Sequence, residues 1–439
     1  MAMGAAGAQD SDPSVAVDRP PLLLRPRFRA YWAGGLVSNV GTWLQNVTAS
    51  VLVLDLTHRP LMVGVLNFAT FAPIFALSMV GGMLSDRFDR RLVVVVSQSV
   101  SLVAAALITG LTMAGRMNAM TLICLATVLG CSYAIAKPAL AALLPALVDE
   151  DEIAHATAVN TLQFNIGQVA GSALSAVVLS FGSYSLAFAL NTLSFAGPLL
   201  AMIALRGVPL PTSGRGVALR GSGAAGLRLV LRSPDMLAVL VAVALSNASV
   251  EALRTSAPEL VGRLPGHGSG SAGVLVMGYA AGATIGLLFF GRLGRRISGM
   301  RLIAAAFVLQ AVGVVATAAA GSLVVAAAFA VPIGLGFSLN IPVLSGYLQH
   351  VSPEAFRGRV MSMFSMVHLG LRPLFSLTAG ALASVMSVRY ALASFVAFPI
   401  LAVILVGRTT QSLPAVGTVA RRGRVDPVPE PPTESRQQA

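Results

Sequence analysis

The chain has 439 residues, of which 56% are hydrophobic and only 11% are charged, and its formal net charge is +13. Soluble domains carry about 25% charged residues, so this chain has too few charges to cover the surface of a soluble fold. The composition therefore predicts a chain whose solvent is lipid. The positive charges stand in short clusters between apolar runs, which indicates topology signals rather than a nucleic-acid-binding surface.

Apolar runs long enough to cross a bilayer recur along the whole chain, since a spanning helix needs about 20 residues. They fall into six runs, a polar gap and six more runs. In chain order they cover residues 30–54, 61–84, 92–114, 117–143, 155–181, 184–205, 235–258, 271–291, 300–320, 322–348, 358–384 and 387–407. The predicted fold class is an all-α polytopic membrane protein with twelve transmembrane helices in two six-helix bundles.

The gap between the sixth and seventh runs contains Pro209, Pro211, several glycines and five arginines. This composition is typical of a linker. The sequence thus predicts a disordered cytoplasmic N-terminal tail, an N-terminal bundle, a cytoplasmic linker, a C-terminal bundle and a disordered cytoplasmic C-terminal tail. Their bounds are 1–24, 25–205, 206–234, 235–407 and 408–439.

Basic residues predict the orientation, because cytoplasmic loops of membrane proteins are enriched in Lys and Arg. With both termini in the cytoplasm, the arginine clusters near residues 25–29, 87–91, 292–301 and 357–359 all lie inside, together with the linker and the C-terminal tail. The opposite loops hold few basic residues, namely Arg59, Arg116, Arg263 and Arg389. A flipped topology would destroy this asymmetry.

An internal repeat relates the two halves. The arginine pair at 90–91 recurs at 295–296, and the acidic Glu150 recurs as Glu354. Both landmarks are displaced by about 205 residues, which indicates two parallel, pseudo-symmetric halves.

Ionisable residues inside the predicted helices are few because charges are costly in lipid, and four of them are candidates for proton coupling. Glu251 and Arg254 stand three apart on the seventh helix, where they can neutralise one another. His368 and Arg372 stand four apart on the eleventh helix, and a histidine can titrate near neutral pH. Glu251 is the first candidate and His368 the second. A fixed ion pair with Arg254 is the alternative role for Glu251.

The sequence contains no nucleotide-binding signature. Its only lysine is Lys137, which precedes Pro138 inside a predicted helix and belongs to no phosphate-binding loop. The five histidines form no metal-binding pattern. We therefore expect no cofactor, no metal site and no enzymatic activity.

The segment 81–91, with the sequence Gly-Gly-Met-Leu-Ser-Asp-Arg-Phe-Asp-Arg-Arg, resembles the signature between helices 2 and 3 of the major facilitator superfamily. Ser85 stands at the usual alanine and Asp89 at the usual glycine. Segments 141–145, 158–165 and 357–362 are similar to the enterobactin-exporter-like and macrolide-efflux-like branch.

The resemblance implies a gate that holds the cytoplasmic side closed. The candidate gate residues are Gly81, Gly82, Asp86, Arg87, Arg90 and Arg91. Asp86 is expected to lie against the positive N-terminus of helix 11, near Gly358, and a solvated topology loop is the alternative. The second half has Gly291 where the first has Asp86, so the gate is expected on one side only.

The resemblance also implies that helices 1, 4, 7 and 10 surround a substrate cavity. Polar and aromatic side chains that are costly in lipid are expected to face it. The candidates are Asn39, Trp43, Asn46, Gln163, Asn247 and Asn340. Hydrogen bonds between helices, without substrate contact, are the alternative role for each. Exporters of this superfamily often have Gly-Pro in helix 5, where this chain has Gly171-Ser172, and this departure weakens the antiporter inference.

Together these features predict a secondary transporter that exports a small hydrophobic or amphipathic compound, such as a drug, a siderophore or a secondary metabolite, by proton antiport. Proton-coupled uptake by symport and a non-transporting membrane sensor or partner-binding protein are the alternatives. The expected partners are the substrate, protons and the bilayer, and the chain is expected to be monomeric. One lysine against 29 arginines is typical of a GC-rich bacterial genome, which favours the bacterial inner membrane.

Overall fold

The computed structural model of the chain describes residues 20–207 and 223–409. These residues form helices joined by short turns, and no strand occurs among them. The first half holds η1 (Leu22–Leu24), α1 (Pro26–Thr57), α2 (Pro60–Arg87), α3 (Arg90–Met113), α4 (Ala119–Leu143), η2 (Leu144–Leu147), η3 (Glu150–Glu152), α5 (Ile153–Ser180), α6 (Tyr184–Ser194) and α7 (Ala196–Ala204).

The second half repeats this pattern after a short extra helix. It holds α8 (Gly223–Arg232), α9 (Pro234–Gly262), η4 (Ser269–Ser271), α10 (Ala272–Arg296), α11 (Gly299–Ala319), α12 (Leu323–Val351), α13 (Glu354–Gly370), α14 (Arg372–Val385), α15 (Val388–Ser394) and α16 (Ala397–Thr409). The amphipathic α8 lies within the predicted linker and buries Val230 beneath the second bundle. Residues 208–222 of the linker, 1–19 of the N-terminal tail and 410–439 of the C-terminal tail lie outside the described residues. The end of the N-terminal tail forms η1, with Leu22 buried.

Local chemistry explains where the helices begin. Pro26, Pro60 and Pro234 stand in the first turns of α1, α2 and α9, where a missing N–H is harmless. Side chains cap other helices: Asn118 accepts from Thr121 N at 2.9 Å before α4, and Ser183 caps α6. These prolines and capping side chains therefore set where each of these helices begins.

Three of the predicted runs are each divided into two helices. The run 184–205 becomes α6 and α7, the run 358–384 becomes α13 and α14, and the run 387–407 becomes α15 and α16. Pro198, Pro373 and Pro399 stand in the first turns of the second helices, where proline interrupts the hydrogen bonding of a continuous helix. The eleventh run is therefore one crossing with a break at Leu371, rather than the single helix predicted.

Eleven helical segments of the described residues are long and apolar enough to cross a membrane, which confirms the prediction of an all-α polytopic membrane protein. The remaining predicted crossing is α1, which has 32 residues. It is long enough to span, but Asn39, Gln45 and Asn46 lower its hydropathy below that of the other crossings. α1 is thus the most polar crossing of the fold.

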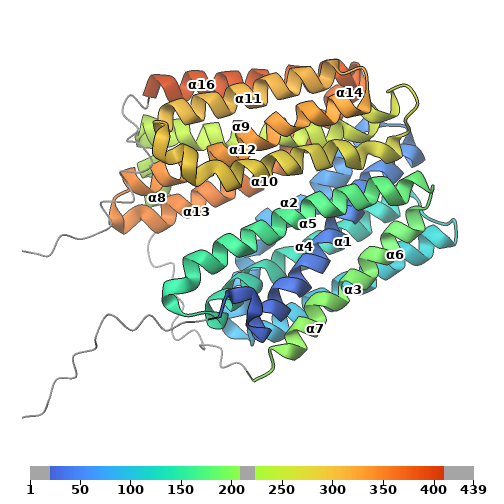
Figure 1. The fold of residues 1–439 in the computed structure, drawn as a ribbon, viewed down its shortest axis with the longest axis horizontal. Helices are drawn as coiled ribbons and strands as arrows, with labels where there is room; N and C mark the ends of the chain where they lie inside the picture. The colour runs from blue at the N-terminus through green and yellow to red at the C-terminus, as the bar shows by residue number, and fades with distance from the viewer. Residues whose placement is uncertain (1–19, 208–222, 410–439) are drawn as a thin grey trace, which may run out of the picture.

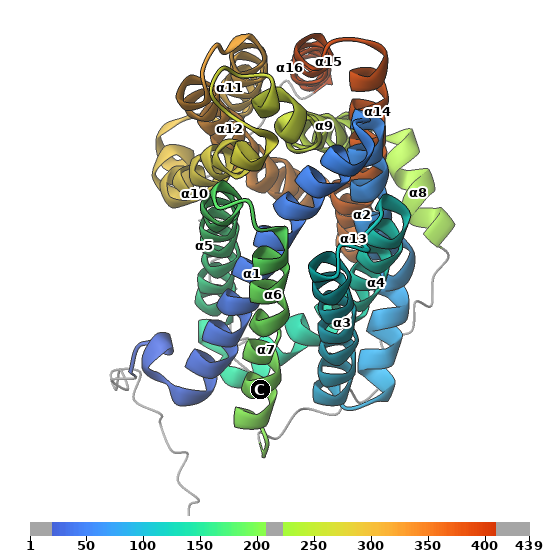
Figure 2. The same cartoon turned by 90° about the vertical axis from the view of Figure 1, so that its right-hand side faces the viewer.

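The helices pack as two bundles, with α1 to α7 in one and α9 to α16 in the other (Figure 1). α1 begins and α16 ends at the same end of the molecule, which we name the terminus end. The opposite end, which holds the turns at 58–59, 114–118, 181–183 and 263–268, is the distal end. Viewed from the distal end, α2 borders α14 and α5 borders α10 (Figure 2).

The bundles touch closely in their distal halves. A Cβ atom added to Gly64 of α2 would lie 2.7 Å from the Ser376 carbonyl oxygen of α14, so the two backbones are in direct contact. Leu61 N donates to Ser384 Oγ at 3.2 Å, and Ser269 Oγ donates to Asp55 at 3.0 Å across the same border. The distal end is therefore closed by small side chains and a few hydrogen bonds.

The same face of α2 becomes exposed toward the terminus end. Gly64 and Phe75 are eleven residues apart, which is about three helical turns, so they share a face. Met79 and Met83 continue it, and both are among the exposed large apolar side chains. The two bundles thus converge at the distal end and separate toward the terminus end (Figure 1).

Candidate functional site

The polar side chains of α1 are held by partners within the first bundle. Asn39 Nδ2 donates to Gln163 Oε1 of α5 at 3.0 Å, and Gln163 Nε2 donates to the Trp32 carbonyl oxygen at 2.9 Å. Farther along α1, Asn191 of α6 donates to Gln45 at 2.5 Å. Asn39 and Gln163 are therefore brought together, as hydrogen-bond partners between helices.

A buried ion-pair cluster forms where α9 meets α14. Arg372 contacts Glu251 Oε1 through Nη2 at 2.5 Å and through Nε at 2.7 Å. Ser376 Oγ donates to the second carboxylate oxygen at 3.1 Å, and Arg254 Nη1 reaches Oε1 at 3.3 Å. Glu251 is only 1% exposed. We name these four residues the Glu251 cluster, and in it one carboxylate serves two guanidinium groups.

Helix geometry sets this arrangement. Glu251 and Arg254 stand three apart on α9, so both reach the same face. Arg372 is the first residue of α14, directly after the break at Leu371, and Ser376 follows it one turn later. The break therefore sets Arg372 at the start of the helix that packs against α9.

Aromatic rings from both bundles cover the cluster. The Arg254 guanidinium lies 4.4 Å from the centroid of the Trp43 ring and 5.3 Å from that of Tyr279. Arg372 lies 5.5 Å from the centroid of the Phe71 ring. These are cation–π distances. Because Trp43 and Phe71 belong to the first bundle and Tyr279 to the second, residues of both bundles cover the cluster.

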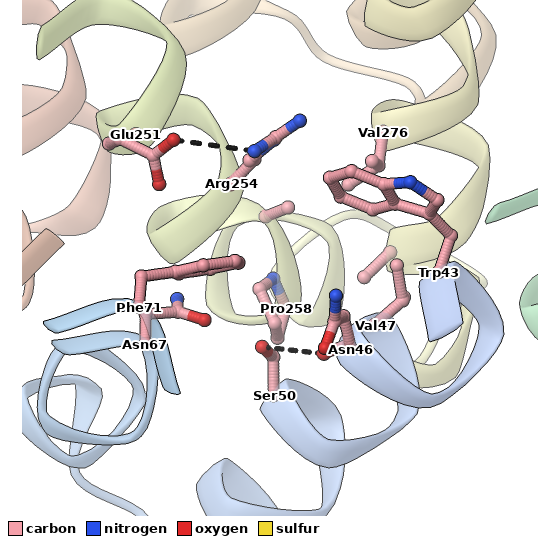
Figure 3. A pocket seen from close by; sticks show the side chains of 12 residues that line it. Trp43, Asn46, Val47, Ser50, Asn67, Phe71, Glu251, Arg254, Pro258 and Val276 are labelled. Carbon is pink, nitrogen blue, oxygen red and sulfur yellow. Dashed lines mark hydrogen bonds and ion pairs between the residues drawn. The ribbon is translucent and has the colours of Figure 1, made fainter. Parts of the chain in front are cut away.

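A small cavity opens between the cluster and α1 (Figure 3). Arg254 lies between Glu251 and Trp43 in this view, with Phe71 and Asn67 on the other side of the space. The lining residues are Trp43, Asn46, Val47, Ser50, Asn67, Phe71, Glu251, Arg254, Ala257, Pro258, Ala272 and Val276. Four crossings, α1, α2, α9 and α10, thus contribute to one cavity at the border of the bundles.

The other proposed proton carrier, His368, lies in a different environment. Its ring stacks between Phe337 and Phe364 with centroid distances of 5.9 Å, and its Nδ1 lies 3.3 Å from Asn247 Nδ2. Asn247 also donates to the Val243 carbonyl oxygen at 2.9 Å. His368 and Arg372 therefore differ in their surroundings: His368 packs among aromatic rings, whereas Arg372 pairs with Glu251.

Asn340 of α12 is fully buried. Both polar atoms of its side-chain amide lack a hydrogen-bond partner within the described residues. Another polar pair of the second bundle is Gln310 and Ser246, joined at 2.8 Å. Of the six predicted cavity residues, Trp43 and Asn46 line the cavity, and Asn39 donates to Gln163. Gln163, Asn247 and Asn340 are buried between helices.

Replacing His368 with phenylalanine is expected to retain most transport activity and to change the melting temperature little. The ring stack with Phe337 and Phe364 survives, and the substitution removes a single hydrogen bond, to Asn247, whose own donor group still reaches Val243. Initial transport rates and melting curves of the variant and the parent chain test this. Loss of proton coupling in the variant would identify His368, rather than Glu251, as the coupling residue.

The predicted gate residues lie at the terminus end. A Cβ atom at Gly81 would meet the Ala134 carbonyl oxygen of α4 at 2.9 Å, whereas Gly82 faces open space. Asp89 caps α3 by accepting from Arg91 N at 2.8 Å, and Arg90 donates to the Ala142 carbonyl oxygen at 3.2 Å. These contacts stay within the first bundle.

The expected approach of Asp86 to helix 11 is not seen in this conformation. Asp86 is exposed, and within the described ranges it makes no hydrogen bond or ion pair. The helix that it was expected to meet begins at Glu354, rather than near Gly358. The reason is physical: the bundles separate toward this end, so Asp86 in the last turn of α2 does not reach the second bundle.

The sequence identified Glu251, Arg254 and Arg372 as candidates, but it did not predict that Glu251 pairs mainly with Arg372. The spacing on α9 suggested Arg254 as the partner, whereas Arg372 makes the shorter contacts. The spacing gives no signal for a pair 121 residues apart. Asn67, which donates to Thr255 Oγ1 at 3.3 Å across the border, was also missed. The feature that could have identified Asn67 is its polar side chain within the otherwise apolar run 61–84.

Comparison with known families agrees with this architecture. The sequence model of the family described as transmembrane secretion effector matches residues 20–436. The chain is 26% identical over 277 residues to the enterobactin exporter EntS of Escherichia coli O1:K1, and 27% identical over 278 residues to that of Citrobacter koseri. Each alignment covers 63% of this chain and 66% of the relative. The chain thus spans just under two thirds of the length of these curated relatives.

Solved structures share the fold at low identity. The nucleoside transporter NupG superposes with a TM-score of 0.70 at 11% identity, over 89% of this chain and 100% of the other. An inward-facing, occupied bacterial homologue of the human lysosomal transporter Spinster gives a TM-score of 0.64 at 14% identity, over 91% and 98% of the two chains. The fold of this chain is therefore the fold of the major facilitator superfamily, and the family and these relatives are transporters, not enzymes.

Proposed function

Because the chain belongs to the transmembrane secretion effector family of the major facilitator superfamily, we propose that it is a secondary active transporter that exports a small hydrophobic or amphipathic compound by alternating access in exchange for protons. The compound is a drug, a siderophore or a secondary metabolite. The curated relatives carry the name enterobactin exporter, which supports export. The proposed location is the bacterial inner membrane, with both termini in the cytoplasm and the distal end outside.

The observation that carries this proposal is the position of the Glu251 cluster at the border of the bundles. The cluster belongs to the second bundle, and Trp43 and Phe71 of the first bundle cover it. The close approach at Gly64 and the hydrogen bonds of Leu61 and Asn67 to the second bundle lie in the distal half, next to the cluster. A rocking motion that opens the distal end would uncover the same charged groups to the outside, which is what alternating access requires.

Proton coupling is proposed to use Glu251. It is the only carboxylate among the described residues that lies deep within a crossing, away from the helix ends. Its three nitrogen contacts and the Ser376 hydroxyl stabilise the ionised form in the conformation described. Protonation therefore requires a second conformation in which water reaches the carboxylate, and the opening of the distal end supplies one.

Uptake by symport is the second candidate, and the composition of the cluster favours it. A proton on Glu251 would release two guanidinium groups from their shared carboxylate. Released guanidinium groups attract an anionic solute, so proton and solute would bind together. Binding of both on the same side is the condition for symport, whereas antiport requires that one excludes the other.

Two measurements test direction and coupling. Cells that express the chain are expected to accumulate less of at least one compound in a panel of dyes, antibiotics and siderophores than cells with an empty vector, and a protonophore should remove the difference. In proteoliposomes with purified protein, a pH gradient should drive that compound against the proton flux. Unchanged accumulation of every compound, or accumulation together with protons, would overturn antiport export, and the second outcome would establish symport.

A further inference from the structure

The interior of the described helices carries more positive than negative charge. Away from the ends of the crossings, the described helices hold the cations Lys137, Arg254 and Arg372 and the single carboxylate Glu251. Buried charges in membranes are normally paired. Arg372 holds Glu251 at 2.5 and 2.7 Å, so the pair accounts for the one negative charge. Arg254, at the cavity, is left as a surplus cation.

The surplus guanidinium has a free donor. Arg254 reaches Glu251 only at 3.3 Å through Nη1, and its side chain is 10% exposed. Its buried Nε–H has no hydrogen-bond partner within the described residues. A buried donor without a partner destabilises the fold, and more so when it belongs to a charged group. Trp43 and Tyr279 lie at cation–π distances from the guanidinium, but neither ring provides a hydrogen-bond acceptor for the Nε–H group.

The same geometry disfavours a cationic ligand at this place. The carboxylate of Glu251 already accepts from Arg372, Arg254 and Ser376. A cationic compound would have to displace Arg372, which would leave a buried guanidinium without its counter-ion. An anionic group, in contrast, would meet the surplus charge and the free donor at once.

We propose that Arg254 binds an oxyanion of the transported compound, such as a carboxylate, sulfonate or phenolate, while an attached flat apolar part packs on the aromatic side of the cavity. Guanidinium groups match such oxyanions in geometry and bind them by charge-assisted hydrogen bonds. Trp43, Phe71 and Val276 supply the apolar surface. The inference rests on the proposed function in that it assigns the class of compound that enters this cavity, and it holds for either direction of transport.

The test uses two probes that share one aromatic skeleton. Anilinonaphthalene sulfonate carries a sulfonate, and phenylnaphthylamine is its neutral counterpart. Binding of each to the purified full-length protein in detergent is followed by probe fluorescence. The wild-type chain is expected to bind the sulfonate probe at least about tenfold more tightly than the neutral probe, which is the effect of one charge-assisted hydrogen bond. Equal binding, or tighter binding of the neutral probe or of cationic ethidium, would overturn the inference without recourse to any variant.

Substitutions of Arg254 test whether this residue causes the preference for the sulfonate probe. Arg254→Gln leaves the pair of Glu251 and Arg372 in place and removes the surplus charge, so it is expected to fold, as checked by gel filtration and melting temperature. It should lose the preference for the sulfonate, and Arg254→Lys should retain part of it. The matched control is Arg263→Gln, which removes a cation that is 54% exposed at the distal end, and it should keep the full preference. A preference that survives Arg254→Gln would place the anion elsewhere and refute the assignment.

The failure of this inference can be told apart from failure of the proposed function. A preference for the anionic probe without any transport would refute the function and leave the site assignment standing. Export of neutral or cationic compounds at a rate that Arg254→Gln does not change would refute the site assignment and leave the function standing.

Discussion

Replacing Glu251 with glutamine is expected to abolish coupled transport and to be the most destabilising polar substitution in the chain. The carboxylate is 1% exposed and serves two guanidinium groups. Its neutralisation leaves two buried cations without a counter-ion, and removing one partner of a buried ion pair costs about 3–5 kcal/mol. Melting temperature in detergent and transport in proteoliposomes measure the two effects.

The charge that remains in the Glu251 cluster predicts the order of stability of the related variants. Arg372→Gln leaves Glu251 with Arg254, so the cluster is neutral and the loss of stability should be smaller than in Glu251→Gln. The double variant that combines Glu251→Gln with Arg372→Gln should be more stable than Glu251→Gln alone, because it buries one cation without a counter-ion instead of two. Glu259→Gln is the matched control, since its partner Arg263 is exposed and such pairs contribute little. Equal stability of Glu251→Gln and Glu259→Gln would contradict the assignment of the cluster.

Replacing Gly64 with valine is expected to prevent closure of the distal end and to reduce transport at least about tenfold, the effect of a modest bias on a two-state equilibrium. The Cβ atom alone would lie 2.7 Å from the Ser376 carbonyl oxygen and 3.2 Å from Leu377 Cα. Backbone atoms of α14 cannot turn away as a side chain can, so the bundles must separate. Gly110→Val on α3 is the matched control, because nothing lies within 4 Å of its Cβ position and the residue has no proposed role in the gate or the cavity.

The conformational effect is measurable as a distance. Spin labels attached through Arg59→Cys and Val385→Cys report the separation of α2 and α14 at the distal end, in a background where Cys124 and Cys131 are replaced by alanine. Gly64→Val should shift the distance distribution to longer values, and Gly110→Val should leave it unchanged. A distribution unaffected by Gly64→Val would mean that the distal contact does not control the conformation.

The crossings were predictable from sequence because a bilayer imposes a length and a hydropathy on every segment. The turns, the two halves and the isolated charges followed from the same pattern. The helix break at Leu371 was not recognised, because the apolar run continues through it and Pro373 alone does not tell a kink from a new helix. This break matters for the site, since it places Arg372 at the beginning of α14.

The sequence predicted which charged residues belong to the site better than it predicted which of them form ion pairs. Glu251 and Arg254 are visible as neighbours on one helix, whereas Arg372 is brought to them by the packing of α14 on α9. The same limit applies to Asp86. Its predicted contact depends on whether the terminus end is closed, and a sequence motif does not specify which of two conformations is described.

The polarity of α1 has a consequence for how the chain enters the membrane. A nascent helix partitions into lipid according to its own side chains, and asparagine and glutamine weaken that partitioning. The partners of Asn39 and Gln45 are Gln163 and Asn191, which lie 124 and 146 residues farther along the chain. During synthesis the side-chain amides of Asn39 and Gln45 therefore lack these hydrogen-bond partners until α5 and α6 have been made. Stable insertion of α1 is therefore expected to follow the synthesis of α5 and α6, although α1 precedes both in the chain.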